Sequence, residues 1–170
     1  MPPHDTTRPK PSPLLMANAT GTEMVAGDHL QLGPLNDLLG YHLSHAVVST
    51  SAMFDRHIGA PFSLSKVEFS MLMLILGNGP LAPKRLANAL ALTAPKMTML
   101  LDRMQSRGLL NRERSEVDRR SQNVVLTAQG ERTARASAAA AATAEASLNS
   151  RLSRAERAML VELLSKVCGR

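Results

Sequence analysis

The feature that most constrains this 170-residue sequence is a change of hydrophobic periodicity at Gly108. Before it, two short segments carry apolar residues at helical spacing, and only a brief break separates them. After it, the strand-like runs LLNRERS and SQNVVLT are joined by the polar run EVDRR. Two short helices that pack on a third and are followed by a hairpin form a winged helix-turn-helix. We therefore predict a mainly α fold with a small β-hairpin wing.

Local signals indicate where the helices of this lobe begin. The run SKVE, Ser65 to Glu68, is a capping box that opens a helix, and GNGP ends that helix. Pro83 suits the first turn of the next helix, and Thr93 is a good N-cap for the one after it. The side chains predicted to face the core from these three helices are Phe69, Leu72, Met73 and Leu76, then Leu86, Ala89 and Leu90, then Met97, Leu100, Leu101 and Met104.

Long helical segments flank the lobe. Apolar residues at helical spacing from Pro34 to about Gly59 predict one helix before it. Thr127 can cap an alanine-rich helix after it, and the capping box SRAE, Ser153 to Glu156, opens a last helix. The spare apolar faces of these helices are well suited to pairing with a second chain. The predicted organisation is a Pro-rich arm over 1–33, a helical dimerisation region over 34–60 and 131–170, and a winged helix-turn-helix lobe over 61–130.

Charge and composition narrow the class of partner. Between Lys84 and Arg120 lie nine basic and four acidic residues, so +5 of the net charge of +6 falls in that stretch. A concentrated basic region is what phosphate binding requires. The single Cys168 excludes an internal disulfide and a cysteine zinc cluster. No apolar run reaches about eighteen residues and no signal-peptide core is present, so we expect a cytoplasmic protein without a membrane partner.

Several motifs between Gly79 and Gly130 keep the spacing of one known family. They are Leu86-Ala87-x-x-Leu90, Thr98 with Leu101-Asp102-Arg103-Met104, Arg107-Gly108-Leu109, Asp118-Arg119-Arg120 and Leu126-Thr127-x-x-Gly130. In these residues the chain resembles the MarR family of bacterial transcriptional regulators. The resemblance implies a homodimer that binds double-stranded DNA at a palindromic operator, most often as a repressor, and that responds to a small effector. The departures from the family pattern are Ala82 in place of a hydroxyl cap, Pro95-Lys96 and Met99 in the recognition helix, and Arg114-Ser115-Glu116 in place of a proline-rich wing tip.

The resemblance gives the second helix of the motif the role of reading DNA. Its outward residues are predicted to be Pro95, Lys96, Thr98, Met99, Asp102 and Arg103. Lys96 and Thr98 can donate to base edges or phosphates, and Met99 can touch a thymine methyl group. An alternative role for Arg103 is a salt bridge to Asp118 that braces the wing.

The wing is expected to supply a second contact. Asp118 is the predicted brace, and Arg120, with Arg119 beside it, is predicted to reach the minor groove or its phosphates. The alternative is a solvated hairpin tip. The residues predicted to contact phosphates are Lys84, Arg85, Arg107, Arg112 and Arg114.

The family also implies an effector site between the dimer helices and the DNA-binding lobe. Its candidates are Tyr41, His45 and Ser49, and its ligand is an aromatic acid or the thioester of one. His42 and His45 lack a third ligand nearby in the sequence, so no metal site is predicted, and no cofactor is implied.

The sequence leaves two other classes of function as alternatives. A winged-helix dimer used only for protein contacts would have a merely solvated basic face. An enzyme is the weakest reading, because no Gly-rich phosphate loop, nucleophile elbow or paired-carboxylate arrangement appears, and no catalytic residue is assigned.

Overall fold

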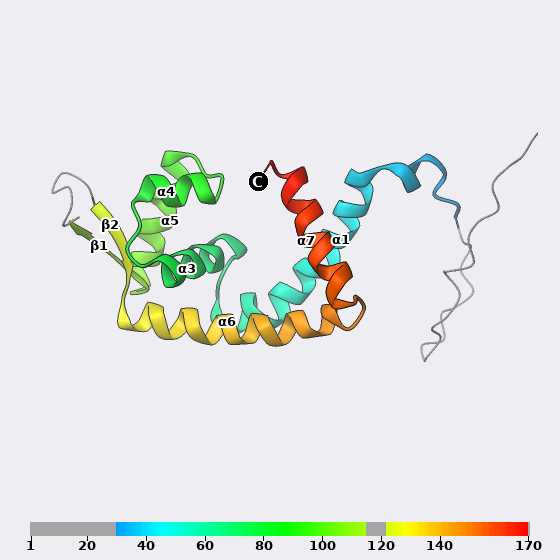
Figure 1. Cartoon of the computed structure of the whole chain (residues 1–170). Helices are drawn as coiled ribbons and strands as arrows, with labels where there is room; N and C mark the ends of the chain where they lie inside the picture. The colour runs from blue at the N-terminus through cyan, green and yellow to red at the C-terminus, as the bar shows by residue number, and fades with distance from the viewer. Residues whose placement is uncertain (1–29, 115–121, 170) are drawn as a thin grey trace, which may run out of the picture. The chain divides into compact units, whose positions relative to one another are not determined.

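The structure is a computed structural model, and it describes residues 30–114 and 122–169 (Figure 1). The chain divides into two compact units, Met1–Leu38 and Leu39–Arg170. The described part of the first unit holds the 3₁₀ helix η1 (Gly33–Asp37), with Pro34 in its first turn. Leu38 has extended backbone (φ −91°, ψ 105°), which cannot continue a helix. The helix predicted to run from Pro34 therefore begins only at Leu39.

The second unit contains the helices and the hairpin of the predicted fold. Its elements are α1 (Leu39–Phe54), η2 (Asp55–Gly59), α2 (Ala60–Phe62), α3 (Lys66–Asn78), α4 (Pro83–Ala89), α5 (Ala94–Ser106), β1 (Leu110–Arg114), β2 (Gln122–Leu126), α6 (Ala128–Asn149) and α7 (Arg154–Val167). The mainly α fold with a two-stranded wing is confirmed.

All four predicted helix starts are confirmed, and at three of them the cap side chain makes a capping hydrogen bond. Ser65 opens α3 with a capping box, in which its N–H donates to Glu68 Oε2 at 2.7 Å and its Oγ accepts the Glu68 N–H. Ser153 opens α7 in the same way. Thr127 Oγ1 accepts the Gly130 N–H at 2.9 Å at the start of α6. Thr93 does precede α5, but its side chain makes no capping hydrogen bond.

The core of the lobe lies around α3, and α4, α5 and the hairpin surround it (Figure 1). The predicted inward stripe of α5 is fully confirmed, as are Leu72 and Leu86. Ala89 was predicted to be buried but is exposed, and Ala87 is buried instead. Phe69, Met73 and Leu76 are only partly buried, whereas Met71 and Ile75 are buried. A central helix packs on more than one side, so a single hydrophobic stripe does not describe it.

Two contacts fasten the wing to the rest of the lobe. β1 and β2 pair antiparallel with Leu110 opposite Leu126, and Leu81 forms an isolated bridge to Val124 through bonds of 3.1 and 2.8 Å. At the start of α6, a Cβ on Gly130 would lie 1.9 Å from the carbonyl oxygen of Leu109. Only glycine permits this close approach, which packs the first turn of α6 against the backbone just before β1.

The alanine-rich α6 packs along α3, and it also contacts η2 and α1. Small side chains allow this approach, and Ala134, Ser137 and Ala144 are buried. In contrast, α7 has no buried residue. Its exposed hydrophobic side chains are Met159, Leu160, Val161, Leu163 and Val167.

Within the described residues, no single helix has the length and hydropathy to cross a membrane. Only Leu39–Phe62 and Lys66–Asn78 counted together meet that test, and they are bent by 73°.

Candidate nucleic-acid interface

The helix α5 has two chemically distinct faces. Met97, Leu100, Leu101 and Met104 are buried against the lobe, as a hydrophobic stripe at positions i, i+3, i+4 and i+7 requires. All six residues predicted to face DNA from this helix are exposed: Pro95, Lys96, Thr98, Met99, Asp102 and Arg103. Met99 is 71% exposed. An exposed methionine between cationic and hydroxyl side chains can contact both apolar and polar edges of bases.

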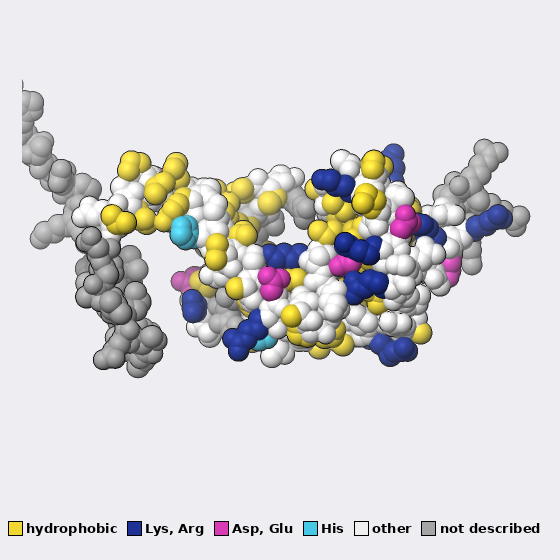
Figure 2. All heavy atoms as spheres, turned by 180° about the vertical axis from the view of Figure 1, so that it is seen from behind, with side chains coloured by type: hydrophobic (Ala, Val, Ile, Leu, Met, Phe, Trp, Pro, Cys, Tyr) yellow, Lys and Arg dark blue, Asp and Glu magenta, His cyan; other side chains and the backbone are white. Residues whose placement is uncertain are grey.

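Basic side chains surround this helix. Lys84 and Arg85 are exposed in the first turn of α4, and Arg114 is exposed at the end of β1. Figure 2 shows Lys and Arg side chains gathered over the lobe that carries α4 and α5, with few acidic side chains among them. The field of such a surface favours a polyanion.

Arg103 and Arg107 share one carboxylate. Arg103 Nε lies 3.1 Å and Arg107 Nη1 3.0 Å from Oε1 of Glu68 on α3. The other oxygen of Glu68 accepts the N–H and the hydroxyl of Ser65, at 2.7 and 2.8 Å. Arg107 also donates from Nη2 to the carbonyl of Ser63 at 2.8 Å. Both of these predicted DNA contacts are therefore also parts of a bond network that joins α5 to the start of α3.

The electrostatics of Glu68 follow from these neighbours. Burial raises the pKa of its carboxyl, but the two Ser65 hydrogen bonds and the charges of Arg103 and Arg107 together lower it below the usual 4.5. Glu68 is therefore ionised at neutral pH, with both oxygens hydrogen-bonded.

The base of the wing is tied to α5 by a second ion pair. Arg112 Nη2 on β1 lies 2.5 Å from Asp102 Oδ1 and 3.5 Å from the Thr98 carbonyl oxygen. Thr98 itself donates its hydroxyl to the Ala94 carbonyl at 3.1 Å. The predicted wing residues Asp118, Arg119 and Arg120 lie outside the described residues, so the alternative pair of Arg103 with Asp118 stays a prediction.

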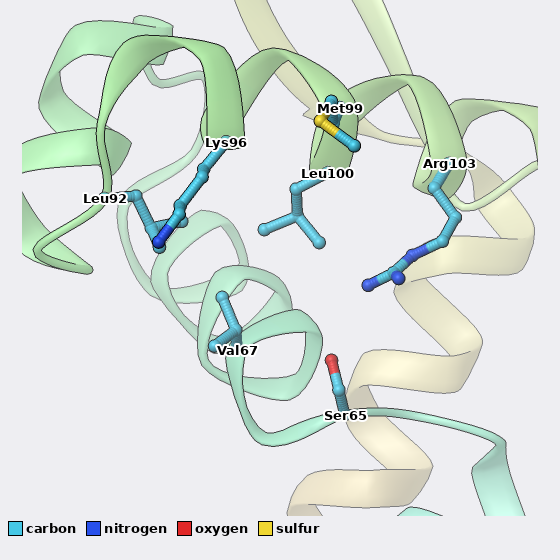
Figure 3. A pocket seen from close by; sticks show the side chains of 7 residues that line it. All are labelled: Ser65, Val67, Leu92, Lys96, Met99, Leu100 and Arg103. Atoms are coloured by element: carbon cyan, nitrogen blue, oxygen red, sulfur yellow. The ribbon is translucent and has the colours of Figure 1, made fainter.

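An apolar cavity of about 470 Å³ opens beside α5 (Figure 3). In Figure 3, Leu100 and Val67 point into it from facing helices, and the Arg103 guanidinium points towards Ser65. The remaining lining residues are Leu92, Lys96 and Met99. A second cavity, of about 410 Å³, lies between α4 and α5 and is lined in part by Pro83, Lys84 and Thr98.

The three effector candidates lie on α1, away from these cavities' linings. The Tyr41 and His45 rings have centroids 4.4 Å apart, and Tyr41 is half-buried while His45 and Ser49 are exposed. None of the three lines either of these two cavities. No group of three or more His, Cys, Asp or Glu in that part of the chain could hold a metal ion.

Sequence reasoning missed Glu68 and Asp102 as partners of the interface arginines. Glu68 was recognised only as a capping residue. The one signal for its second role is the i, i+4 spacing of Arg103 and Arg107, which places two cations on one side of α5.

Comparisons with known proteins agree with this arrangement. The model of the MarR family matches residues 64–122. The transcriptional regulator MgrA of Staphylococcus aureus is 32% identical over 133 residues, which cover 78% of this chain and 89% of MgrA. The repressor CouR bound to a 23-mer DNA duplex superposes with a TM-score of 0.76 at 32% identity, covering 83% of this chain and 99% of CouR. CouR bound to p-coumaroyl-CoA gives a TM-score of 0.72 at 30% identity, covering 82% and 97%.

Proposed function

Because this chain belongs to the MarR family, we propose that it is a homodimeric repressor that leaves a palindromic operator when a small effector binds. It is a MarR-type transcriptional regulator, and we propose that it binds DNA in the cytoplasm. The observation that carries the proposal is the outer face of α5, where Lys96, Thr98 and Met99 are exposed beside a basic surface. The similar CouR holds a DNA duplex.

Pairing of two chains is supported by the hydrophobic surface of α7 and α1. Leu160, Leu163 and Val167 on α7 and Val47 and Val48 on α1 are all exposed in the single chain. Exposed patches of this kind mark protein interfaces. A twofold dimer presents two recognition helices to half-sites about 10 base pairs apart, one turn of duplex.

The proposed effector is an aromatic acid or the thioester of one. CouR, which is similar over most of this chain, is seen with p-coumaroyl-CoA. The candidate residues on this chain are Tyr41, His45 and Ser49, because a tyrosine ring that is tilted against an imidazole offers an apolar surface and hydrogen-bonding groups together.

Binding to selected DNA tests the proposal. Duplexes would be selected by the protein from a random pool, and the dissociation constant of the best duplex measured over a range of salt concentrations. We expect a twofold sequence and a steep salt dependence, because counterions are released when phosphates are neutralised. A winged-helix dimer that contacts only proteins would select no sequence and show no such slope.

A double variant tests the recognition helix within the same assay. Lys96→Ala with Thr98→Ala should weaken binding to the selected duplex by roughly 1–3 kcal/mol per lost base contact and spare binding to random duplex. Equal losses on both duplexes would mean that these side chains contact only phosphates.

A separate experiment tests the effector. Aromatic acids and their coenzyme A thioesters that raise the melting temperature of the protein would be tested for their ability to release it from the selected duplex.

A further inference from the structure

Glu68 is the one buried charged residue among the described residues. It lies in the first turn of α3, yet its carboxylate pairs with Arg103 in the last turn of α5 and with Arg107, the cap residue after that helix. This carboxylate accepts three hydrogen bonds, two from Ser65 and one from Arg107, and its side chain is only 5% exposed. Such a carboxylate is strongly held, because leaving either oxygen unpaired in the interior is costly.

The two arginines depend on Glu68 to different degrees. Arg107 is 31% exposed and keeps a second bond to the Ser63 carbonyl. Arg103 is 57% exposed and forms an ion pair with Glu68 through Nε, the guanidinium nitrogen nearest the aliphatic part of the side chain. An ion pair at Nε holds the base of the guanidinium and leaves its two outer nitrogens beyond the carboxylate. Figure 3 shows Arg103 bent across the cavity mouth towards Ser65, not extended along the helix.

We propose that Glu68 is a positioning residue for DNA reading, which sets the tilt of α5 and the orientation of the Arg103 guanidinium. The proposal rests on the proposed function, since it assigns Glu68 a part in that same interface. Glu68 itself touches no DNA. It makes the preference for the operator sequence sharper, because it holds the Arg103 guanidinium and the C-terminal end of α5 in place.

The sign of the expected effect separates positioning from bulk charge. Replacing Glu68 with glutamine makes the protein more positive by one charge, which by simple electrostatics strengthens binding to any duplex. Glutamine is accepted in a capping box, so the Ser65 bonds survive, while its neutral amide nitrogen can neither accept the Arg107 hydrogen bond nor form an ion pair with Arg103. Positioning therefore predicts weaker binding to the selected duplex and unchanged or tighter binding to a random one.

The experiment compares Glu68→Gln with Glu156→Gln, the same change in the other capping box of the chain. Within the described residues, no arginine forms an ion pair with Glu156. We expect Glu68→Gln to lower the ratio of selected-duplex to random-duplex affinity by about tenfold, the size of one lost base contact, and Glu156→Gln to leave it unchanged. A parallel gain on both duplexes, or the same result for both variants, would overturn the proposal.

Two further measurements keep the proposal decidable. If Glu68→Gln does not fold, Arg103→Lys is measured in its place, because lysine keeps the charge but has no Nε–H. A ratio of selected-duplex to random-duplex affinity equal to that of the wild type would then overturn the proposal. If the wild-type protein selects no DNA, the proposed function fails, and hydrogen exchange then decides the positioning role alone. Faster exchange of α5 amides in Glu68→Gln, with Glu156→Gln unchanged, supports it, and unaltered α5 exchange refutes it.

Discussion

The winged helix-turn-helix lobe buries its hydrophobic residues, whereas the last helix, α7, leaves its own exposed. In the lobe, Met71, Leu72, Leu86 and Met104 are completely buried, with a relative exposure of 0%. On α7, Leu160 and Leu163 are 45% and 50% exposed, and no residue of that helix is buried. Both regions contain an amphipathic helix, α5 in the lobe and α7, and both contain a capping box. They differ in whether the same chain supplies the opposing surface.

The difference indicates which functions belong to one chain and which need a second. The lobe contains every element that positions the outer face of α5, and the bonds of Glu68 and Asp102 to its arginines complete that support. By contrast, the apolar face of α7 remains open to solvent. The proposed DNA-reading surface is thus built within one chain, and we propose that a partner chain covers the apolar face of α7.

The largest expected effect comes from emptying the core of the lobe. Leu72→Ala should lower the free energy of unfolding by about 2–5 kcal/mol, since it leaves a cavity in a fully enclosed site. Leu163→Ala should cost roughly 0.5 kcal/mol or less at protein concentrations low enough to keep the chain monomeric. Urea unfolding followed by circular dichroism measures both. Similar losses of unfolding free energy in the two variants would contradict the difference in burial between the lobe and α7.

The next effect concerns association. Leu160→Asp with Leu163→Asp should convert a dimer into a monomer in analytical ultracentrifugation and leave the helical content unchanged, because a buried charge at each position opposes pairing. Met99→Asp, an apolar-to-acidic change at a more exposed position on α5, is the control and should leave the protein dimeric. A wild-type protein that is already monomeric at micromolar concentration, yet binds a palindrome at full strength, would contradict the proposed dimer.

A smaller effect is expected at the wing, which belongs to the DNA-reading side of the comparison. Arg120→Ala should weaken binding to the selected duplex and make the salt slope shallower by about one unit, with no change in dimerisation. Asp118→Ala should also weaken binding, although it removes a negative charge. Tighter binding by Asp118→Ala together with unchanged binding by Arg120→Ala would show that the wing is only solvated.

The smallest effect is a pH dependence of the stability that Glu68 gives to the lobe. The lowered pKa of Glu68 means that its contribution to stability is present above the ordinary value of 4.5 and is lost as the pH falls through its pKa in the folded protein. The stability difference between wild type and Glu68→Gln should therefore shrink in acid. Thermal melts at pH 7 and at several values below 4.5 measure it. A difference that stays constant, or grows in acid, would contradict the assigned cause.

Much of the fold could be predicted from local signals. The capping boxes at Ser65 and Ser153, the cap at Thr127 and the periodicity change at Gly108 each depend on neighbouring residues alone. Such signals act within a turn or two of backbone, so the sequence states them directly. The exposed face of α5 followed from the same logic, since four buried positions determine which others point outward.

The parts that could not be predicted depend on distant residues. Glu68 and Arg107 are thirty-nine positions apart. The spacing of Arg103 and Arg107 places two cations on one side of α5, but it does not identify the carboxylate that they meet. Ala87 rather than Ala89 is buried because the neighbours of α4, and not its own pattern, decide which side is enclosed.

By itself, the sequence determined the helices, their caps, the hairpin and the basic region, because propensity, capping and charge are local properties. The tertiary structure alone decided which of the predicted DNA-contacting arginines are also held by a carboxylate, and where hydrophobic surface is left uncovered. The physical reason is that burial and ion pairing depend on what the fold brings close in space, and only the packing of α3 against α5 brings Glu68 to Arg103 and Arg107.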